Sequence, residues 1–120
     1  MPTVETTPLN QPIVTDTWRE KYAAPGEDAW EDTCARVAAA LAGGDPELHD
    51  QIKQAMLDRE IAPAGRILAG AGTDKRVTLI NCFVSADIQD SMATQPDQPG
   101  LGIMDALSAA AYTQQMGGGI

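Results

Sequence analysis

Apolar residues recur at helical spacing between residues 30 and 41, where they form a single stripe. The spacing between its members is that of one face of an α-helix. We therefore predict a helix that begins near Asp28-Ala29 and ends at Gly43-Gly44, because glycine commonly stops helices. The members of the stripe are Trp30, Cys34, Val37, Ala38 and Leu41.

Two further helices are predicted on either side of this one. Thr17 and Glu20 have the spacing of a capping box, so a short helix is expected to begin there and to end before Pro25-Gly26. Asp45-Pro46 begins the other helix, with proline at the first helical position, where its missing N–H is not needed. The expected buried face of this helix consists of Leu48, Ile52, Ala55 and Met56.

The pattern changes after residue 60. Residues 61–73 are rich in Gly and Ala without a sustained period and predict a connector. Residues 77–84 (VTLINCFV) form a short apolar run with β-branched members, which predicts a buried strand. Residues 93–100 contain two prolines and predict a loop. A last helical face is formed by Ile103, Ala106, Leu107, Ala110 and Ala111, ahead of the glycine triplet 117–119.

A single buried strand cannot satisfy its own backbone N–H and C=O groups. The pattern therefore predicts the beginning of a larger fold. Residues 1–14 contain three prolines and show no periodicity, and we expect a disordered or loosely docked arm there.

Composition and charge exclude several classes of function. The 120 residues carry 8 Lys and Arg against 17 Asp and Glu, a formal net charge of -9, which argues against sequence-independent binding of nucleic acid. We find no apolar run of the roughly 20 residues that a membrane helix needs, and no signal peptide. Two Cys and one His are too few for the usual four-ligand metal site, so no metal is expected. We expect the two cysteines to be free thiols in a reducing cytoplasm, where free thiols persist.

The apolar content is built from small side chains. Hydrophobic residues make up 43% of the chain, but aromatic residues only 4%. Because the stabilisation from burial scales with apolar area, at about 25 cal/mol per Å², such a core is thin. We expect marginal stability for the chain alone, or packing against a partner.

Few side chains are candidates for chemistry on these grounds. Cys82 lies within the predicted strand, where the ordinary interpretation of a free thiol is a small buried hydrophobe. Cys34, on the apolar stripe, is interpreted as structural, and His49 as a surface histidine. Asp90 and Asp105 are interpreted as solvated or capping carboxylates. A bare glycine triplet is only a weak sign of phosphate binding.

Four short motifs occur in a specific order: residues 63–73 (PAGRILAGAGT), 78–85 (TLINCFVS), 90–92 (DSM) and 112–120 (YTQQMGGGI). Together they resemble the N-terminal part of the catalytic chain of ribonucleotide reductases, most closely the adenosylcobalamin-dependent (class II) branch. Residues 17–42 (TWREKYAAPGEDAWEDTCARVAAALA) are similar to the helical segment at the start of that branch. The resemblance covers about residues 15–120.

The resemblance implies roles for particular residues. Cys82 matches one of the two cysteines that reduce the ribose 2′-position and end in a disulfide, its partner coming from a later strand. Asn81 and the glycines Gly117, Gly118 and Gly119 match substrate contacts, and Ala62-Pro63 the approach to the substrate phosphates. Asp90, Ser91 and Met92 match a segment that helps to hold a deoxynucleotide specificity effector at a dimer interface.

The fold implied is an α+β fragment that is mostly helical. Residues 1–14 are the arm, 15–60 a helical N-terminal segment, and 61–120 the beginning of a ten-stranded α/β barrel that this chain does not complete. This last part comprises the connector, the first strand, the effector segment, a helix and the glycine turn. Residues 93–100 look like an insertion relative to the family.

The implied partners follow from the same resemblance. They are a ribonucleotide substrate, a deoxynucleotide effector, the remainder of the reductase chain, and thioredoxin or glutaredoxin as reductant, without nucleic acid or membrane. Adenosylcobalamin is the implied cofactor, bound by parts missing here, so the chain alone is expected to be inactive. A class I reductase with a separate radical-generating subunit stays open. So does a non-catalytic helical module that docks on an intact reductase or another partner.

Overall fold

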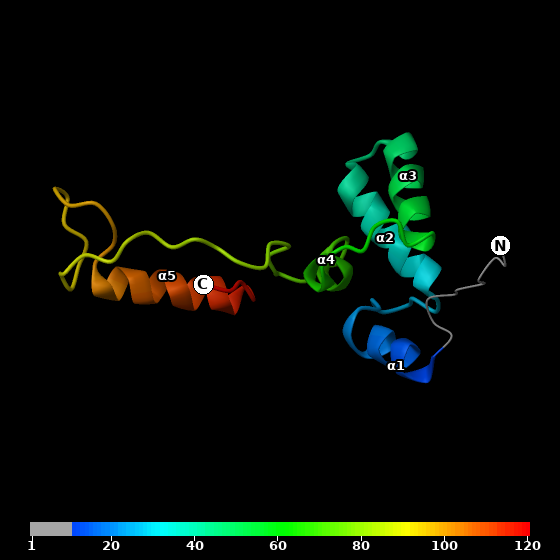
Figure 1. Cartoon of the computed structure of the whole chain (residues 1–120), viewed down its shortest axis with the longest axis horizontal. Helices are drawn as coiled ribbons and strands as arrows, with labels where there is room; N and C mark the ends of the chain where they lie inside the picture. The colour runs from blue at the N-terminus through cyan, green and yellow to red at the C-terminus, as the bar shows by residue number, and fades with distance from the viewer. Residues whose placement is uncertain (1–10) are drawn as a thin grey trace. The chain divides into compact units, whose positions relative to one another are not determined.

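The computed structural model describes residues 11–120, which contain five helices and no β-strand (Figure 1). The chain divides into two compact units, residues 1–74 and 75–120, and each is described by itself. No helix in the described part is long and apolar enough to cross a membrane. The first unit contains α1 (Pro12–Lys21), α2 (Trp30–Ala42), α3 (Pro46–Leu57) and α4 (Gly65–Gly70), and the second contains α5 (Ile103–Gln115).

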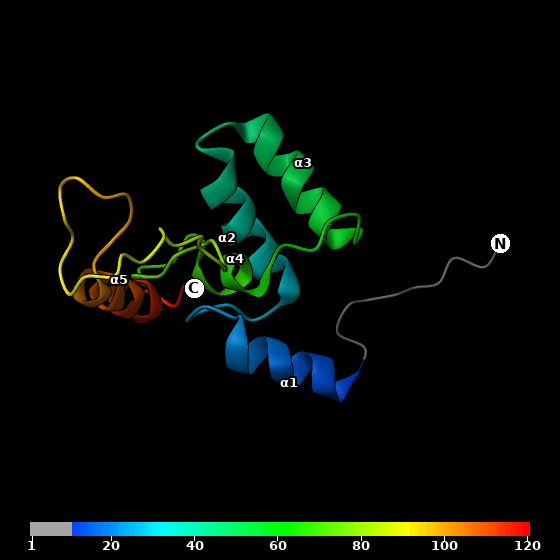
Figure 2. The same ribbon diagram turned by 60° about the vertical axis from the view of Figure 1, so that its left-hand side comes forward.

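The two helices predicted on either side of Gly43-Gly44 are confirmed as α2 and α3, which lie side by side as a hairpin (Figure 2). At the start of α2, the Asp32 carboxylate accepts hydrogen bonds of 3.0 Å from the N–H groups of Asp28 and Ala29. Gly43 follows α2 with φ 60°, a left-handed conformation that glycine adopts without strain. The Asp45 carboxylate then accepts from the N–H groups two and three residues further on, which fixes the start of α3.

The core of the first unit lies at the open end of this hairpin. Its fully buried members are Cys34, Val37, Met56 and Ala71, with Trp30, Ile52, Leu57, Ile67 and Leu68 packed against them. At the other end, Leu41 and Leu48 belong to the predicted apolar faces but are 43% and 39% exposed. The core is therefore as thin as the composition predicts, and it covers only part of each helix.

The first helix differs from its prediction. α1 begins at Pro12, so Thr17 and Glu20 lie inside it and form no capping box. Proline presets the backbone for a first helical turn, which explains the earlier start. The helix is anchored by Trp18, which is buried and donates a hydrogen bond of 2.9 Å to the Thr33 hydroxyl. The expected disordered arm is thus helical from residue 12, and residues 1–10 lie outside the described part.

The expected connector contains a short helix, α4, that the sequence pattern does not reveal. Six residues are too few to show a helical period, and two of them are glycine. Tertiary contacts stabilise α4 instead, because it packs on α2 and its last carbonyls accept hydrogen bonds from the Arg36 side chain.

The predicted buried strand at residues 77–84 is wrong in this structure. The segment is extended, but its only bridge partner is Gly119, which pairs with Cys82 in parallel. Val84 is fully exposed and Ile80 is 61% exposed. A strand needs neighbouring strands to satisfy its backbone, and residues 11–120 supply none. The extended chain runs instead along α5 (Figure 1), and isolated bridges pair Cys82 with Gly119 after this helix and Ile88 with Leu101 before it.

Candidate functional site

Cys82 lies where the extended segment meets the glycine turn after α5. The Gly119 N–H donates a hydrogen bond of 2.7 Å to the Asn81 carbonyl, and the Phe83 N–H donates one of 3.0 Å to the Gly119 carbonyl. The two bonds flank Cys82 and form the parallel bridge between Cys82 and Gly119. Residues that are 37 positions apart in the sequence are thereby brought together, and they include Asn81, Cys82 and Gly119 of the predicted substrate site.

The glycine triplet makes this approach possible. Gly117 has φ 79°, which turns the chain back after α5, and its N–H donates to Gln114. A Cβ atom on Gly118 would lie 2.7 Å from the Phe83 ring and 2.8 Å from the Thr113 methyl group, which leaves no room for a side chain. Gly117 and Gly118 are therefore required by backbone conformation and by close packing, respectively.

The two cysteines have opposite environments. Cys34 is completely buried in the first unit, and burial raises the pKa of its thiol to about 11, which agrees with its interpretation as structural. Cys82 is exposed, so the interpretation as a small buried hydrophobe is wrong for it. The Cys82 thiol lies beside Gly119, since a Cβ atom there would be 3.6 Å from Sγ. An accessible thiol beside a backbone turn is suited to redox or nucleophilic chemistry.

The second predicted site lies at the other end of α5. The carbonyls of Ser91 and Met92 accept hydrogen bonds of 2.8 and 3.0 Å from the first two N–H groups of α5. The Asp90 side chain is exposed, which agrees with its interpretation as a solvated carboxylate. Since α5 has 13 residues, about 20 Å separates this segment from the glycine turn. Within the second unit the structure therefore brings together the members of each predicted site and keeps the two sites apart, whereas Ala62-Pro63 belongs to the first unit.

Residues 93–100 form a loop whose shape depends on two side chains. Asp105 in α5 accepts hydrogen bonds of 2.7 Å from both the N–H and the hydroxyl of Thr94. The hydroxyl bond first, and then the N–H bond, lower the pKa of the Asp105 carboxyl, which thus holds the loop rather than capping a helix end. Gln89 is 6% exposed and makes three hydrogen bonds to the loop. Sequence reasoning missed Gln89, because no local pattern marks a glutamine as buried.

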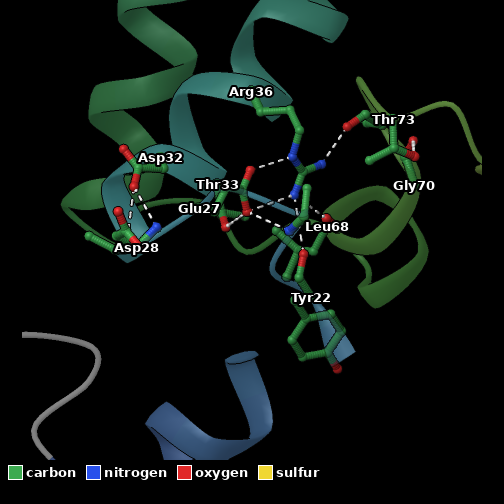
Figure 3. Close-up of polar contacts among 12 residues, drawn as sticks. Tyr22, Glu27, Asp28, Asp32, Thr33, Arg36, Leu68, Gly70 and Thr73 are labelled. Carbon is green, nitrogen blue, oxygen red and sulfur yellow. Dashed lines mark hydrogen bonds and ion pairs between the residues drawn. The ribbon is translucent and has the colours of Figure 1, made fainter. Parts of the chain in front are cut away.

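Sequence reasoning also missed the polar cluster around Arg36, which joins separate segments of the first unit (Figure 3). The Arg36 guanidinium forms an ion pair of 2.5 Å with Glu27 and donates to three backbone carbonyls, those of Tyr22, Leu68 and Ala71. Both charged side chains are largely buried, with exposed fractions of 12% and 9%. Five hydrogen-bond donors on one planar group explain why a single arginine can join these segments.

Glu27 is held as a carboxylate by its neighbours. Burial, the largest single influence, raises the pKa of this carboxyl, but the hydrogen bonds from Arg36, Thr33 and the Ala24 N–H, together with the charge of Arg36, outweigh it. The pKa is therefore lowered from its ordinary value. Because the cluster is internally satisfied, we interpret it as structural.

The remaining candidate residues do not form a site in the described part. The His49 ring lies 2.9 Å from the Asp50 carboxylate and is partly exposed, as expected for a surface histidine. Residues 11–120 contain no group of three or more His, Cys, Asp or Glu side chains that could hold a metal ion.

A comparison with protein families identifies the helical part of the chain. Residues 10–76 match the family model described as "Ribonucleotide reductase, all-alpha domain". The match covers more than half of the chain, which therefore belongs to this ribonucleotide reductase family. No curated protein and no solved structure matches the chain. The helical fold of residues 11–74 agrees with an all-α domain.

Proposed function

We propose that the chain is the N-terminal part of the catalytic chain of a ribonucleotide reductase of the adenosylcobalamin-dependent branch. The complete enzyme would convert ribonucleotides to deoxyribonucleotides for DNA synthesis in the cytoplasm. One observation carries the proposal beyond the family match. The backbone pairing of Asn81 and Phe83 with Gly119 presents the exposed Cys82 thiol beside a glycine turn.

The proposed role of Cys82 is to deliver reducing equivalents. Cys82 and a second cysteine, from a later part of the reductase, are together oxidised to a disulfide and release two electrons and two protons. The ribose C2′–O bond breaks, a C2′–H bond forms, and the hydroxyl leaves as water. Thioredoxin or glutaredoxin would then reduce the disulfide. Adenosylcobalamin, bound by other parts of the enzyme, would supply the radical that starts the reaction on a third cysteine.

The exposed apolar surface of the second unit supports an origin within a larger protein. A groove of about 510 Å³ lies between α5 and residues 83–88, with Phe83, Leu107 and Ala110 among its walls. Val84 and Ile88 are also exposed, and α5 has no buried residue. An extended apolar segment with unpaired backbone groups is suited to receive further strands. We infer that residues 77–84 become the first barrel strand when the remainder of the reductase is present.

Reconstitution tests this function. The chain is mixed with the remaining reductase polypeptide, and adenosylcobalamin-dependent formation of deoxyribonucleotide is measured under thioredoxin turnover. Cys82→Ser should abolish turnover, and the matched control Cys34→Ala should retain it, once both variants are shown to assemble. Turnover by the Cys82→Ser enzyme would contradict the role of this thiol. Activity that requires a separate radical-generating subunit instead of adenosylcobalamin would show that the enzyme is a class I reductase.

The second candidate function is a non-catalytic module that docks on an intact reductase or another partner. The self-contained core and the satisfied Arg36 cluster of the first unit favour it, because they do not depend on Cys82. A cooperative thermal transition of the isolated chain, together with failure to reconstitute activity, would support this alternative.

A further inference from the structure

The segment Asp90–Met92 is fixed by the loop that follows it. Gln89, next to this segment, donates hydrogen bonds from its side-chain amide to the carbonyls of Gln98 (2.9 Å) and Gly100 (3.0 Å). Its amide oxygen accepts a bond of 2.9 Å from the Gln95 N–H. One buried side chain thus closes the loop at three points, and a replacement that cannot form these bonds leaves three backbone groups of the loop without this partner.

A second set of contacts closes the loop from the side of α5. The Asp105 carboxylate holds Thr94, and the Thr94 hydroxyl in turn accepts a hydrogen bond of 3.0 Å from the Gly102 N–H. Gly102 packs against the backbone of Ala93 so closely that a Cβ atom would overlap it. The loop is therefore locked onto the first turn of α5.

The two sets of contacts restrict the backbone of the segment between them. The Gln89 N–H donates to the Leu101 carbonyl at 2.8 Å, and the Ile103 N–H donates to the Ser91 carbonyl at 2.8 Å. The Gln95 amide also donates to the Ser91 hydroxyl at 3.2 Å. Within this framework the side chains of Asp90 and Met92 stay exposed. A ligand that contacts Asp90 would meet a group on a backbone that is already ordered.

We propose that Gln89 and Asp105 are positioning residues that set the response of the enzyme to its deoxynucleotide effector. They act by holding loop 93–100 against the effector segment Asp90–Met92. This inference rests on the proposed function. Without these contacts the effector must order the segment as it binds, and the cost of that ordering weakens its apparent affinity.

The test uses the reconstituted enzyme and titrates the effector. Gln89→Glu replaces the amide donor with an oxygen that faces two carbonyls, and we expect the effector concentration for half-maximal stimulation to rise roughly tenfold. The matched control is Gln98→Glu, which makes the same chemical change on an exposed side chain of the same loop. The control should stay within about twofold of the unsubstituted enzyme.

The shape of the titration separates positioning from a general structural defect. A positioning role shifts the midpoint, and saturating effector restores turnover and substrate preference. A merely structural role lowers turnover equally at every effector concentration, and that result would overturn the proposal. If Gln89→Glu does not assemble, Asp105→Asn provides the same test, because it weakens only the charge-assisted bonds to Thr94.

Hydrogen exchange completes the design. Faster exchange at the Gln95 and Gly102 amides shows that the loop has been released, and an unchanged effector midpoint in that variant overturns the inference. Ribonucleotide reduction by the unsubstituted enzyme without any effector response overturns the inference and leaves the proposed function standing. Absence of reduction in every condition overturns the proposed function itself.

Discussion

The two units of the chain are stabilised in different ways. In residues 11–74, side chains make the long-range contacts: a small apolar core and the Arg36 cluster connect four helices. In residues 75–120, backbone hydrogen bonds and the polar side chains of one loop make them, while the apolar side chains of α5 stay exposed. The comparison teaches that the first unit has its own apolar core and polar cluster, which can stabilise it independently. The second is ordered by backbone pairing, with its apolar surface still available.

The largest expected effect comes from removing the centre of the first unit. Arg36→Ala leaves Glu27 buried without its charge partner and three carbonyls without a donor. We expect the free energy of unfolding of this unit to fall by about 4 kcal/mol, a large part of the stability of a small domain. Urea denaturation followed by the helical circular dichroism signal measures it. Arg36→Lys keeps the charge but loses the planar donors, so its free energy of unfolding should lie between those of Arg36→Ala and the unsubstituted protein. Equal free energies of unfolding for all three proteins would contradict a stabilising role of the cluster.

Next comes a matched pair of truncations, one in each unit. Met56 is 1% exposed in α3, and Leu107 is 60% exposed in α5. Met56→Ala should destabilise the first unit by about 3 kcal/mol, because it creates a cavity in the core. Leu107→Ala should change stability by less than about 0.5 kcal/mol in the isolated chain. The same denaturation assay compares them, and a large loss in Leu107→Ala would show that α5 is buried in solution.

The two thiols give a third test of the contrast. In the native protein at pH 8, a thiol reagent such as 5,5′-dithiobis(2-nitrobenzoate) should modify Cys82 quickly and Cys34 at least about a hundredfold more slowly. The reasons are the exposure of Cys82 and, for Cys34, complete burial with a pKa raised to about 11. Cys82→Ser should abolish the fast phase, whereas Cys34→Ala should keep it. Two equally fast phases in the folded protein would show that the core is open.

The smallest expected effect is the dependence of the first unit on acid. The pKa of Glu27 is lower in the folded chain than its ordinary value of 4.5. The stability contributed by its ionised form is therefore fully present above pH 4.5 and is lost as the pH falls towards the lowered folded-state pKa. Denaturation at a series of pH values from neutral to acid measures this slope. Glu27→Gln should be less stable at neutral pH and should show a shallower loss; an unchanged slope would assign the acid sensitivity to other groups.

Local signals explain which parts of the fold could be predicted. The bounds of α2 and α3 depend on Gly43, Asp45 and Pro46, whose effects reach only a few residues along the chain. The roles of Arg36 and Gln89 depend on partners that the fold supplies, at separations of up to 35 residues for Arg36. No local pattern encodes these contacts, so both residues were missed.

The predicted strand at residues 77–84 failed for a related reason. A run of β-branched and apolar residues indicates suitability for a sheet, but a strand also requires neighbours to accept and donate its hydrogen bonds. The members of the candidate site could be predicted, because its motifs lie in short segments whose order is visible in the sequence. The resemblance to ribonucleotide reductases placed Asn81, Cys82 and Gly119 in one predicted site, and the structure brings their backbones together. Their chemical roles stay predictions.

The bridge between Cys82 and Gly119 has a consequence for how this region folds. It closes a long loop with only two hydrogen bonds, and closure of a flexible loop of this length is entropically costly. Formation of α5 converts 13 of the intervening residues into a rigid rod and so shortens the flexible path. Helix formation therefore favours docking of the cysteine segment. The surroundings of Cys82 are consequently sensitive to any partner that stabilises α5, even at its far end.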